Sequence, residues 1–120
     1  MEQPMDDVTI LHNPRCSKSR ETLALLEQRG IRPRIVEYLV EPPSAAELAR
    51  IIDLLGIGPR ELMRRNEAEY AALGLDDPAL GREALIDAMH QHPRLIERPI
   101  VLANGKAAIG RPPEAVLAIL

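Results

Sequence analysis

The only cysteine of the chain, Cys16, lies among residue types that are suited to thiol chemistry. Arg15 and Lys18 flank it, His12 precedes it by four positions, and Ser19 follows it by three. The nucleophile is the thiolate rather than the thiol, and nearby cations or a position at a helix start lower a cysteine pKa. Serine hydroxyls can also donate hydrogen bonds to the sulfur, which favours its charged form. Because apolar neighbours are lacking, the segment predicts a reactive thiol rather than the commoner inert, buried cysteine.

The spacing around Cys16 disfavours three other kinds of site. No second His or Cys stands at ligand spacing from His12, so no metal is expected. A phosphatase loop would place an arginine six residues after the cysteine, where this chain has Thr22. A dithiol redox loop would place a second cysteine at position 19, which is a serine. The predicted site is monothiol, so a thiol from outside the chain, such as glutathione or a glutaredoxin, must resolve any adduct on Cys16.

Composition excludes several partners. The net charge is −3 with 28% charged residues, which gives no basic excess for a phosphate backbone, and two tyrosines are the only aromatic residues. We therefore expect no nucleic-acid partner. No apolar run approaches the roughly 20 residues that span a bilayer, and no signal segment opens the chain, so no membrane partner is expected either. A single cysteine cannot form an internal disulfide, and we expect a cytoplasmic location.

Hydrophobic periodicity places the thiol where a strand passes into a helix. Gly30 is placed to end that helix, Ser44 with Glu47 forms a capping-box pattern, and Asn104-Gly105 is a two-residue hairpin signal. In chain order, the sequence predicts a strand over 8–11, a helix over 17–29, a strand over 34–39, helices over 45–55, about 59–65, about 68–73 and 81–92, strands over 99–102 and 106–109, and a final helix over 114–120.

This order is similar to the α/β thioredoxin-like, or glutaredoxin-like, fold. The resemblance implies a mixed four-stranded sheet with a helical insertion over about 44–92 between its two halves, all within a single domain over 1–120. In such folds the proline before the third strand is typically cis and lies beside the thiol, and here that residue would be Pro99.

A more specific resemblance covers nearly the whole chain. The segment His12-Asn13-Pro14-Arg15-Cys16-Ser17-Lys18-Ser19 resembles the HNPxCxxS signature of the glutaredoxin-linked arsenate reductases, and the chain is most similar to their short, chromosomal-type members. Further segments that resemble the family are 41–44 at the turn into the insertion, 61–66 with an arginine helix, and the two late arginine motifs at 96–101 and 110–114.

The resemblance implies an enzyme of arsenic detoxification, an arsenate reductase that converts arsenate to arsenite. Its expected small-molecule partner is arsenate or a similar oxyanion. Cys16 would attack the oxyanion, and His12 and Ser19 would lower the pKa of its thiol. Glutathione would then displace the adduct and glutaredoxin would reduce the mixed disulfide, so both act as co-substrates and no bound cofactor is expected. Three arginines would hold the oxyanion: Arg64, Arg98 and Arg111.

The residues alone leave alternatives open. Arg98 precedes Pro99 and Arg111 follows Gly110, so both can project from the end of the sheet, but a surface arginine at a strand end is an equally good interpretation. One alternative function is an Spx-like redox-responsive transcription regulator without enzymatic activity, although many of these carry a second cysteine that is missing here. Another is a monothiol glutathione-linked oxidoreductase acting on mixed disulfides.

Overall fold

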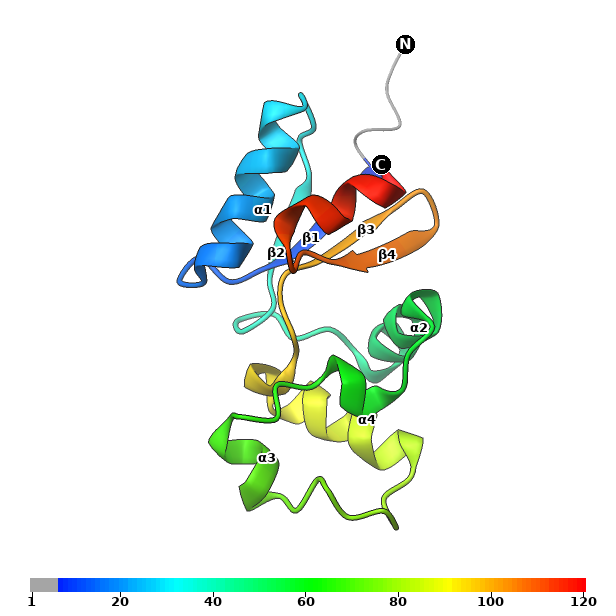
Figure 1. Cartoon of the computed structure of the whole chain (residues 1–120). Helices are drawn as coiled ribbons and strands as arrows, with labels where there is room; N and C mark the ends of the chain where they lie inside the picture. The colour runs from blue at the N-terminus through cyan, green and yellow to red at the C-terminus, as the bar shows by residue number, and fades with distance from the viewer. Residues whose placement is uncertain (1–6) are drawn as a thin grey trace. The chain divides into compact units, whose positions relative to one another are not determined.

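The computed structural model describes residues 7–120, which form two compact units (Figure 1). The described part of the first unit comprises residues 7–41 and 98–120, and the second unit is Pro42–Glu97. The second unit contains the segment expected as a helical insertion and a few residues on each side of it. The expected single domain over 1–120 stays a prediction.

The first unit is built on a four-stranded mixed sheet with the order β2-β1-β3-β4. Its strands are β1 (Thr9–His12), β2 (Arg34–Glu37), β3 (Ile100–Ala103) and β4 (Lys106–Ile109). β1 runs parallel to β2 and antiparallel to β3, and β3 and β4 form the predicted antiparallel hairpin. Asn104 and Gly105 both have positive φ, 54° and 72°, as the tight hairpin turn requires. The predicted fold class is confirmed.

Two helical segments complete this unit. The helix α1 (Ser17–Gln28) connects the parallel strands, and η4 (Pro113–Ile119) follows β4 beside α1 (Figure 1). The predicted final helix is present and is a 3-10 helix, with the i→i+3 bond from Ala115 N–H to Pro112 O at 2.9 Å. A short terminal segment led by prolines favours this tighter form. The buried core between sheet and helices is aliphatic and contains Val8, Ile10, Leu26, Ile31, Val101, Ala103, Val116 and Ile119.

The second unit is helical. Its elements are α2 (Ala45–Leu55), η2 (Pro59–Leu62), α3 (Ala68–Ala72), α4 (Arg82–Gln91) and η3 (Pro93–Leu95). The capping box at the start of α2 is present as predicted: Ser44 Oγ accepts the N–H of Glu47 at 3.1 Å, and the Glu47 carboxylate accepts the N–H of Ser44 at 3.0 Å. Most of its large aliphatic side chains are buried: Leu48, Ile51, Ile52, Leu62, Met63, Leu85, Ile86, Met89, Leu95 and Ile96.

The prediction of a helix over 59–65 is wrong beyond Leu62. The 3-10 segment η2 ends there, and Met63 is extended and forms a bridge with Ile96. The N–H of Arg64 donates to Leu95 O at 2.7 Å. The backbone of 62–64 therefore pairs with 95–97 instead of continuing a helix, and Arg64 lies on extended chain rather than on the expected arginine helix.

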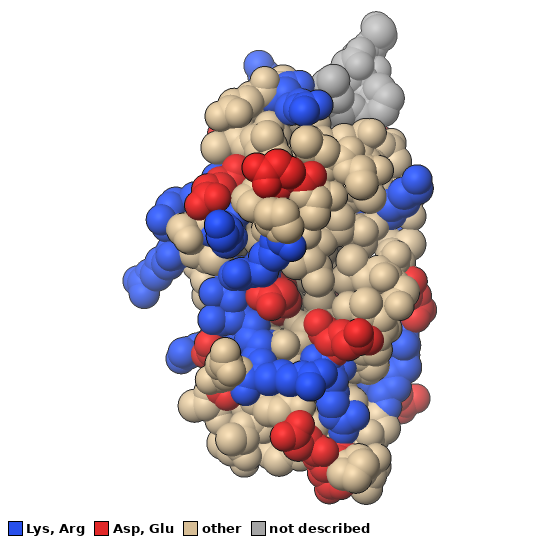
Figure 2. Space-filling model, viewed as in Figure 1, with Lys and Arg blue, Asp and Glu red and all other residues tan. Residues whose placement is uncertain are grey.

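Basic and acidic side chains both occur on the surface shown in Figure 2, where several basic groups adjoin acidic ones. This agrees with the small net charge of −3. Within residues 7–120, no helix has the length and apolar character needed to cross a membrane. The cytoplasmic location stays a prediction.

Candidate functional site

The thiol lies at the start of α1. Cys16 has extended backbone dihedrals (φ −96°, ψ 124°) and is the N-cap residue, so the free N–H groups of the first helical turn surround its side chain. The backbone N–H groups of Ser19 and Lys18 favour the thiolate and lower the pKa of Cys16, although Cys16 forms no side-chain cap hydrogen bond. The positive end of the helix dipole adds to this environment. The sequence prediction of a strand-to-helix junction is therefore confirmed at the position where it matters for reactivity.

Opposing effects set the acidity of this thiol. Burial raises the pKa of Cys16, since the residue is only 8% exposed. The N–H groups of Ser19 and Lys18 and the guanidinium groups of Arg98 and Arg111 lower the pKa, and together they outweigh the burial. The net result is a pKa below the ordinary value for a thiol, which increases the thiolate fraction at neutral pH.

His12 and Ser19 form a buried pair beneath the loop that leads to the thiol. The Nδ1 atom of His12 lies 2.6 Å from Ser19 Oγ, which also accepts the N–H of Asn13 at 3.0 Å. The hydroxyl of Ser19 therefore has partners in His12 and Asn13, and donation from this hydroxyl to the sulfur stays a prediction. The roles of His12 and Ser19 in lowering the thiol pKa stay predictions.

The imidazole of His12 is neutral near pH 7. Burial lowers the pKa of His12. The negative charge of Glu37, which is paired with His12 in the neighbouring strand, raises this pKa but does not offset the effect of burial. The Nδ1 atom of a neutral ring can accept a hydrogen bond from the Ser19 hydroxyl, while the oxygen of that hydroxyl accepts a hydrogen bond from the N–H of Asn13. The pair therefore ties the end of β1 and the start of the loop to the first turn of α1.

Two of the predicted arginines converge on the thiol. Arg111 Nη2 lies 3.6 Å from Cys16 Sγ, and Arg111 Nε donates to Arg98 O at 2.8 Å. The peptide bond between Arg98 and Pro99 is cis, as the fold resemblance implied, and the bond between Arg111 and Pro112 is cis as well. The two guanidinium groups thus bring positive charge to the sulfur from the start of β3 and the end of β4.

Sequence reasoning missed the packing that supports these arginines. A Cβ atom on Gly110 would lie 2.5 Å from Thr22 Oγ1 and 2.8 Å from Pro99 Cγ, so only glycine fits between the end of β4 and α1. Thr22 is fully buried, and its hydroxyl donates to Lys18 O at 2.8 Å. From the sequence, Gly110 was considered only as the residue before Arg111. Its position directly before Arg111 was the available signal.

Arg64, the third predicted arginine, belongs to the second unit. Its Nη1 atom forms an ion pair with Glu67 Oε2 at 3.0 Å, and Glu67 also pairs with Arg94 Nη2 at 3.1 Å. Binding of an oxyanion by Arg64 stays a prediction.

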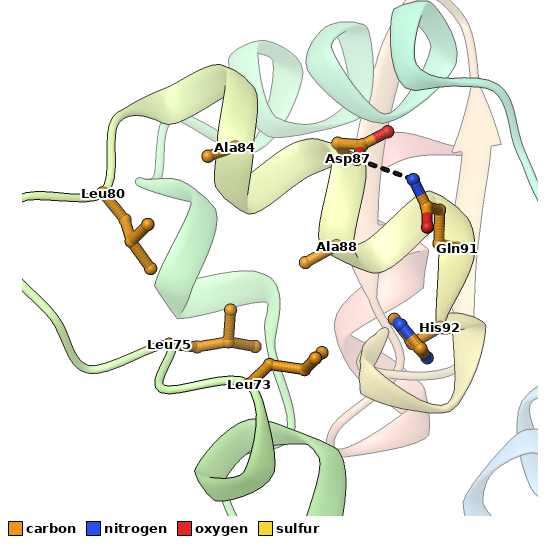
Figure 3. Close-up of a pocket in the computed structure, with 8 residues that line it drawn as sticks. All are labelled: Leu73, Leu75, Leu80, Ala84, Asp87, Ala88, Gln91 and His92. Atoms are coloured by element: carbon orange, nitrogen blue, oxygen red, sulfur yellow. Dashed lines mark hydrogen bonds between the residues drawn. The ribbon is translucent and has the colours of Figure 1, made fainter.

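The second unit also contains a separate hollow of about 240 Å³ (Figure 3). Leu75 and Leu80 face α4 across it, and its rim carries Gln91, whose Nε2 donates to Asp87 Oδ2 at 2.8 Å. The hollow is mainly apolar, and its polar side chains Gln91 and Asp87 form a hydrogen bond with each other. Among residues 7–120 no group of three His, Cys, Asp or Glu side chains could hold a metal.

The thiol region is therefore the candidate site.

A mixed sheet, a thiol at the start of α1 and a cis proline before β3 define a single-cysteine protein of the thioredoxin-like fold. The chain belongs to the ArsC family, whose model matches residues 11–119. An arsenate reductase of Neisseria meningitidis is 53% identical over 117 residues, covering 97% of this chain and 100% of that protein. The uncharacterized protein YfgD of Escherichia coli is 57% identical over 114 residues, covering 94% and 96%. The solved structure of an arsenate reductase from Vibrio cholerae has a TM-score of 0.92 at 55% identity, covering 94% and 97%.

Proposed function

We propose that this protein is an arsenate reductase in which Cys16 is the nucleophile. The observation that carries the proposal is the position of the sulfur, which lies at the N-cap of α1 and 3.6 Å from a guanidinium nitrogen of Arg111. Arsenate is a tetrahedral oxyanion, and arginine binds such groups through its planar fork. Relatives that are about half identical over nearly their full length are named arsenate reductases, which supports the same substrate.

The first chemical step joins sulfur to arsenic. The thiolate of Cys16 attacks arsenate, an arsenic–oxygen bond breaks, and the departing oxygen leaves as water after protonation. Arg98 and Arg111 balance the negative charge of the remaining oxygens, and their existing positive charge near the sulfur requires little rearrangement.

The second step is a two-electron reduction by external thiols. The thiolate of glutathione attacks the Cys16 sulfur, and the sulfur–arsenic bond breaks with its electron pair going to arsenic. Arsenic(V) becomes arsenic(III) and leaves as arsenite, while the two sulfurs become a mixed disulfide. A glutaredoxin thiol then attacks the glutathione sulfur and releases the Cys16 thiolate. The external thiols are necessary because Cys16 is the only cysteine of the chain.

A coupled assay tests this proposal. Protein, arsenate, glutathione, glutaredoxin and glutathione reductase are mixed, and NADPH consumption is followed. We expect an arsenate-dependent rate that Cys16→Ser abolishes and that Arg34→Gln, at an exposed position of β2, leaves unchanged. The absence of any arsenate-dependent rate would refute the function. A rate that needs only a glutathione mixed disulfide, without arsenate, would instead identify a monothiol oxidoreductase.

A further inference from the structure

A cavity of about 350 Å³ lies in the first unit and is lined by the loop that leads to the thiol. Part of its wall is this loop, from His12 to Arg15, and another part is the end of β2 with the turn after it, including Glu37 and Val40. The parallel strands β1 and β2 both end here. Ligands of α/β proteins commonly bind outside the carboxyl ends of parallel strands, and this volume suits a small molecule.

Hydrogen bonds hold both parts of the wall. In the loop, Asn13 Oδ1 accepts the N–H of Arg15 at 3.0 Å, and Asn13 O accepts the N–H of Cys16 at 3.0 Å. After β2, the N–H of Val40 donates to Glu37 O at 2.9 Å. A cavity with such a fixed wall needs little ordering when a ligand binds, which lowers the cost of binding.

The charges in the lining select a class of ligand. Arg15 is a cation on the loop and Glu37 is an anion on β2, while Leu39 and Val40 add an apolar surface that is 40% and 76% exposed. A bare oxyanion would be repelled by Glu37, and a bare cation by Arg15. A ligand that carries both charges on a partly apolar body satisfies all of these groups.

We propose that this cavity binds the body of the small peptide thiol that attacks the Cys16 adduct. The α-ammonium group of the ligand pairs with Glu37, a carboxylate pairs with Arg15, and the methylene groups contact Leu39 and Val40. Glutathione belongs to this chemical class. The inference rests on the proposed function, since it assigns a site to the thiol whose sulfur attacks the Cys16 sulfur and forms the mixed disulfide. Holding that thiol beside the loop raises its effective concentration at the adduct.

Binding can be tested without arsenate. The probe is S-methylglutathione, which keeps both charges but cannot react, titrated into the full chain and followed by amide NMR shifts. We expect the largest shifts at His12, Leu39 and Val40. Because each charge makes one exposed contact, Glu37→Gln and Arg15→Gln should each weaken binding by about threefold to tenfold. Glu41→Gln and Arg34→Gln remove the same charges from nearby residues outside the lining, and should leave binding unchanged.

Kinetics give the second readout. In the coupled assay, Glu37→Gln should raise the KM for glutathione by about threefold to tenfold while the KM for arsenate stays the same. Absence of NMR shifts at the cavity, or equal weakening by Glu37→Gln and Glu41→Gln, would overturn the site. A higher KM for glutaredoxin with an unchanged KM for glutathione would also overturn it, because the surface would then contact the protein partner. Since the NMR titration needs no arsenate, a failure of the proposed function would leave that test intact.

Discussion

Substitution of Gly110 by alanine tests whether close packing at the end of β4 positions the arginine at the thiol. The added Cβ would lie 2.5 Å from Thr22 Oγ1, 2.8 Å from Pro99 Cγ and 3.2 Å from Thr22 Cγ2. Atoms do not approach a Cβ so closely, so Thr22, Pro99 or the backbone at 110 must move. Thr22 is fully buried and its hydroxyl is bonded to Lys18 O at 2.8 Å, so it has little freedom to do so.

The expected cost follows from these contacts. Overpacking of a buried site costs about 1–3 kcal/mol, and loss of the Thr22 hydrogen bond adds about 1 kcal/mol. The lower entropy of the unfolded alanine chain offsets about 0.4–1 kcal/mol of this. The free energy of unfolding should therefore fall by roughly 1–4 kcal/mol, which corresponds to a decrease in Tm of roughly 4–16 °C for a chain of this size.

The assay combines thermal or urea unfolding with the pH dependence of Cys16 alkylation by iodoacetamide. Because Arg111 directly follows residue 110, its displacement should move the alkylation profile to higher pH as well as lower stability. Gly81→Ala is the matched control, since a Cβ there meets nothing within 4 Å. In a Thr22→Ala background, two of the three contacts vanish and Gly110→Ala should cost less. Equal effects of Gly110→Ala and Gly81→Ala would refute the packing argument.

Three other predictions concern the thiol, its histidine and the second unit. Arg111→Ala removes a cation that lowers the Cys16 pKa, so the alkylation profile should shift to higher pH, and an unchanged profile would contradict the assigned cause. Folding lowers the pKa of His12, so the unfolded chain takes up its proton first, and stability should be lost as the pH falls from about 6.5 through the folded value. Urea unfolding at several pH values should show a smaller loss for His12→Asn, and an equal loss would exclude His12 as the source. Ser44→Ala removes the side-chain cap of α2 and should lower the free energy of unfolding by about 1 kcal/mol, whereas Ser44→Thr keeps the cap and should change it little.

The sheet and the thiol junction could be predicted because their signals are local. The β-branched run before the loop, the Asn104-Gly105 turn and the Ser44 capping box each encode their structure within a few residues. The helix ends were harder, since the segments from Pro59 and from Pro113 have helical composition but form 3-10 turns. At 62–64 the backbone pairs with residues about thirty positions later, and a local pattern carries no information on that partner.

At the candidate site, too, local signals could be predicted and contacts between distant residues could not. The sequence indicated Cys16, and Arg98 and Arg111 were candidates whose convergence depends on the β3–β4 hairpin and its register with β1. The partner of the Ser19 hydroxyl, the buried ring of His12, could not be read from the sequence because seven residues separate the two. The need for glycine at position 110 arises from α1 packing against the end of β4, which no short motif expresses.

The central claim is that Cys16 transfers electrons from external thiols to arsenate. The most direct measurement separates arsenate from arsenite by chromatography and detects arsenic by mass spectrometry, after incubation with glutathione and glutaredoxin. We predict that arsenite accumulates catalytically with the wild-type chain and that Cys16→Ser gives no more arsenite than the thiols alone. Equal arsenite formation by Cys16→Ser and wild type, or none by wild type, would contradict the claim.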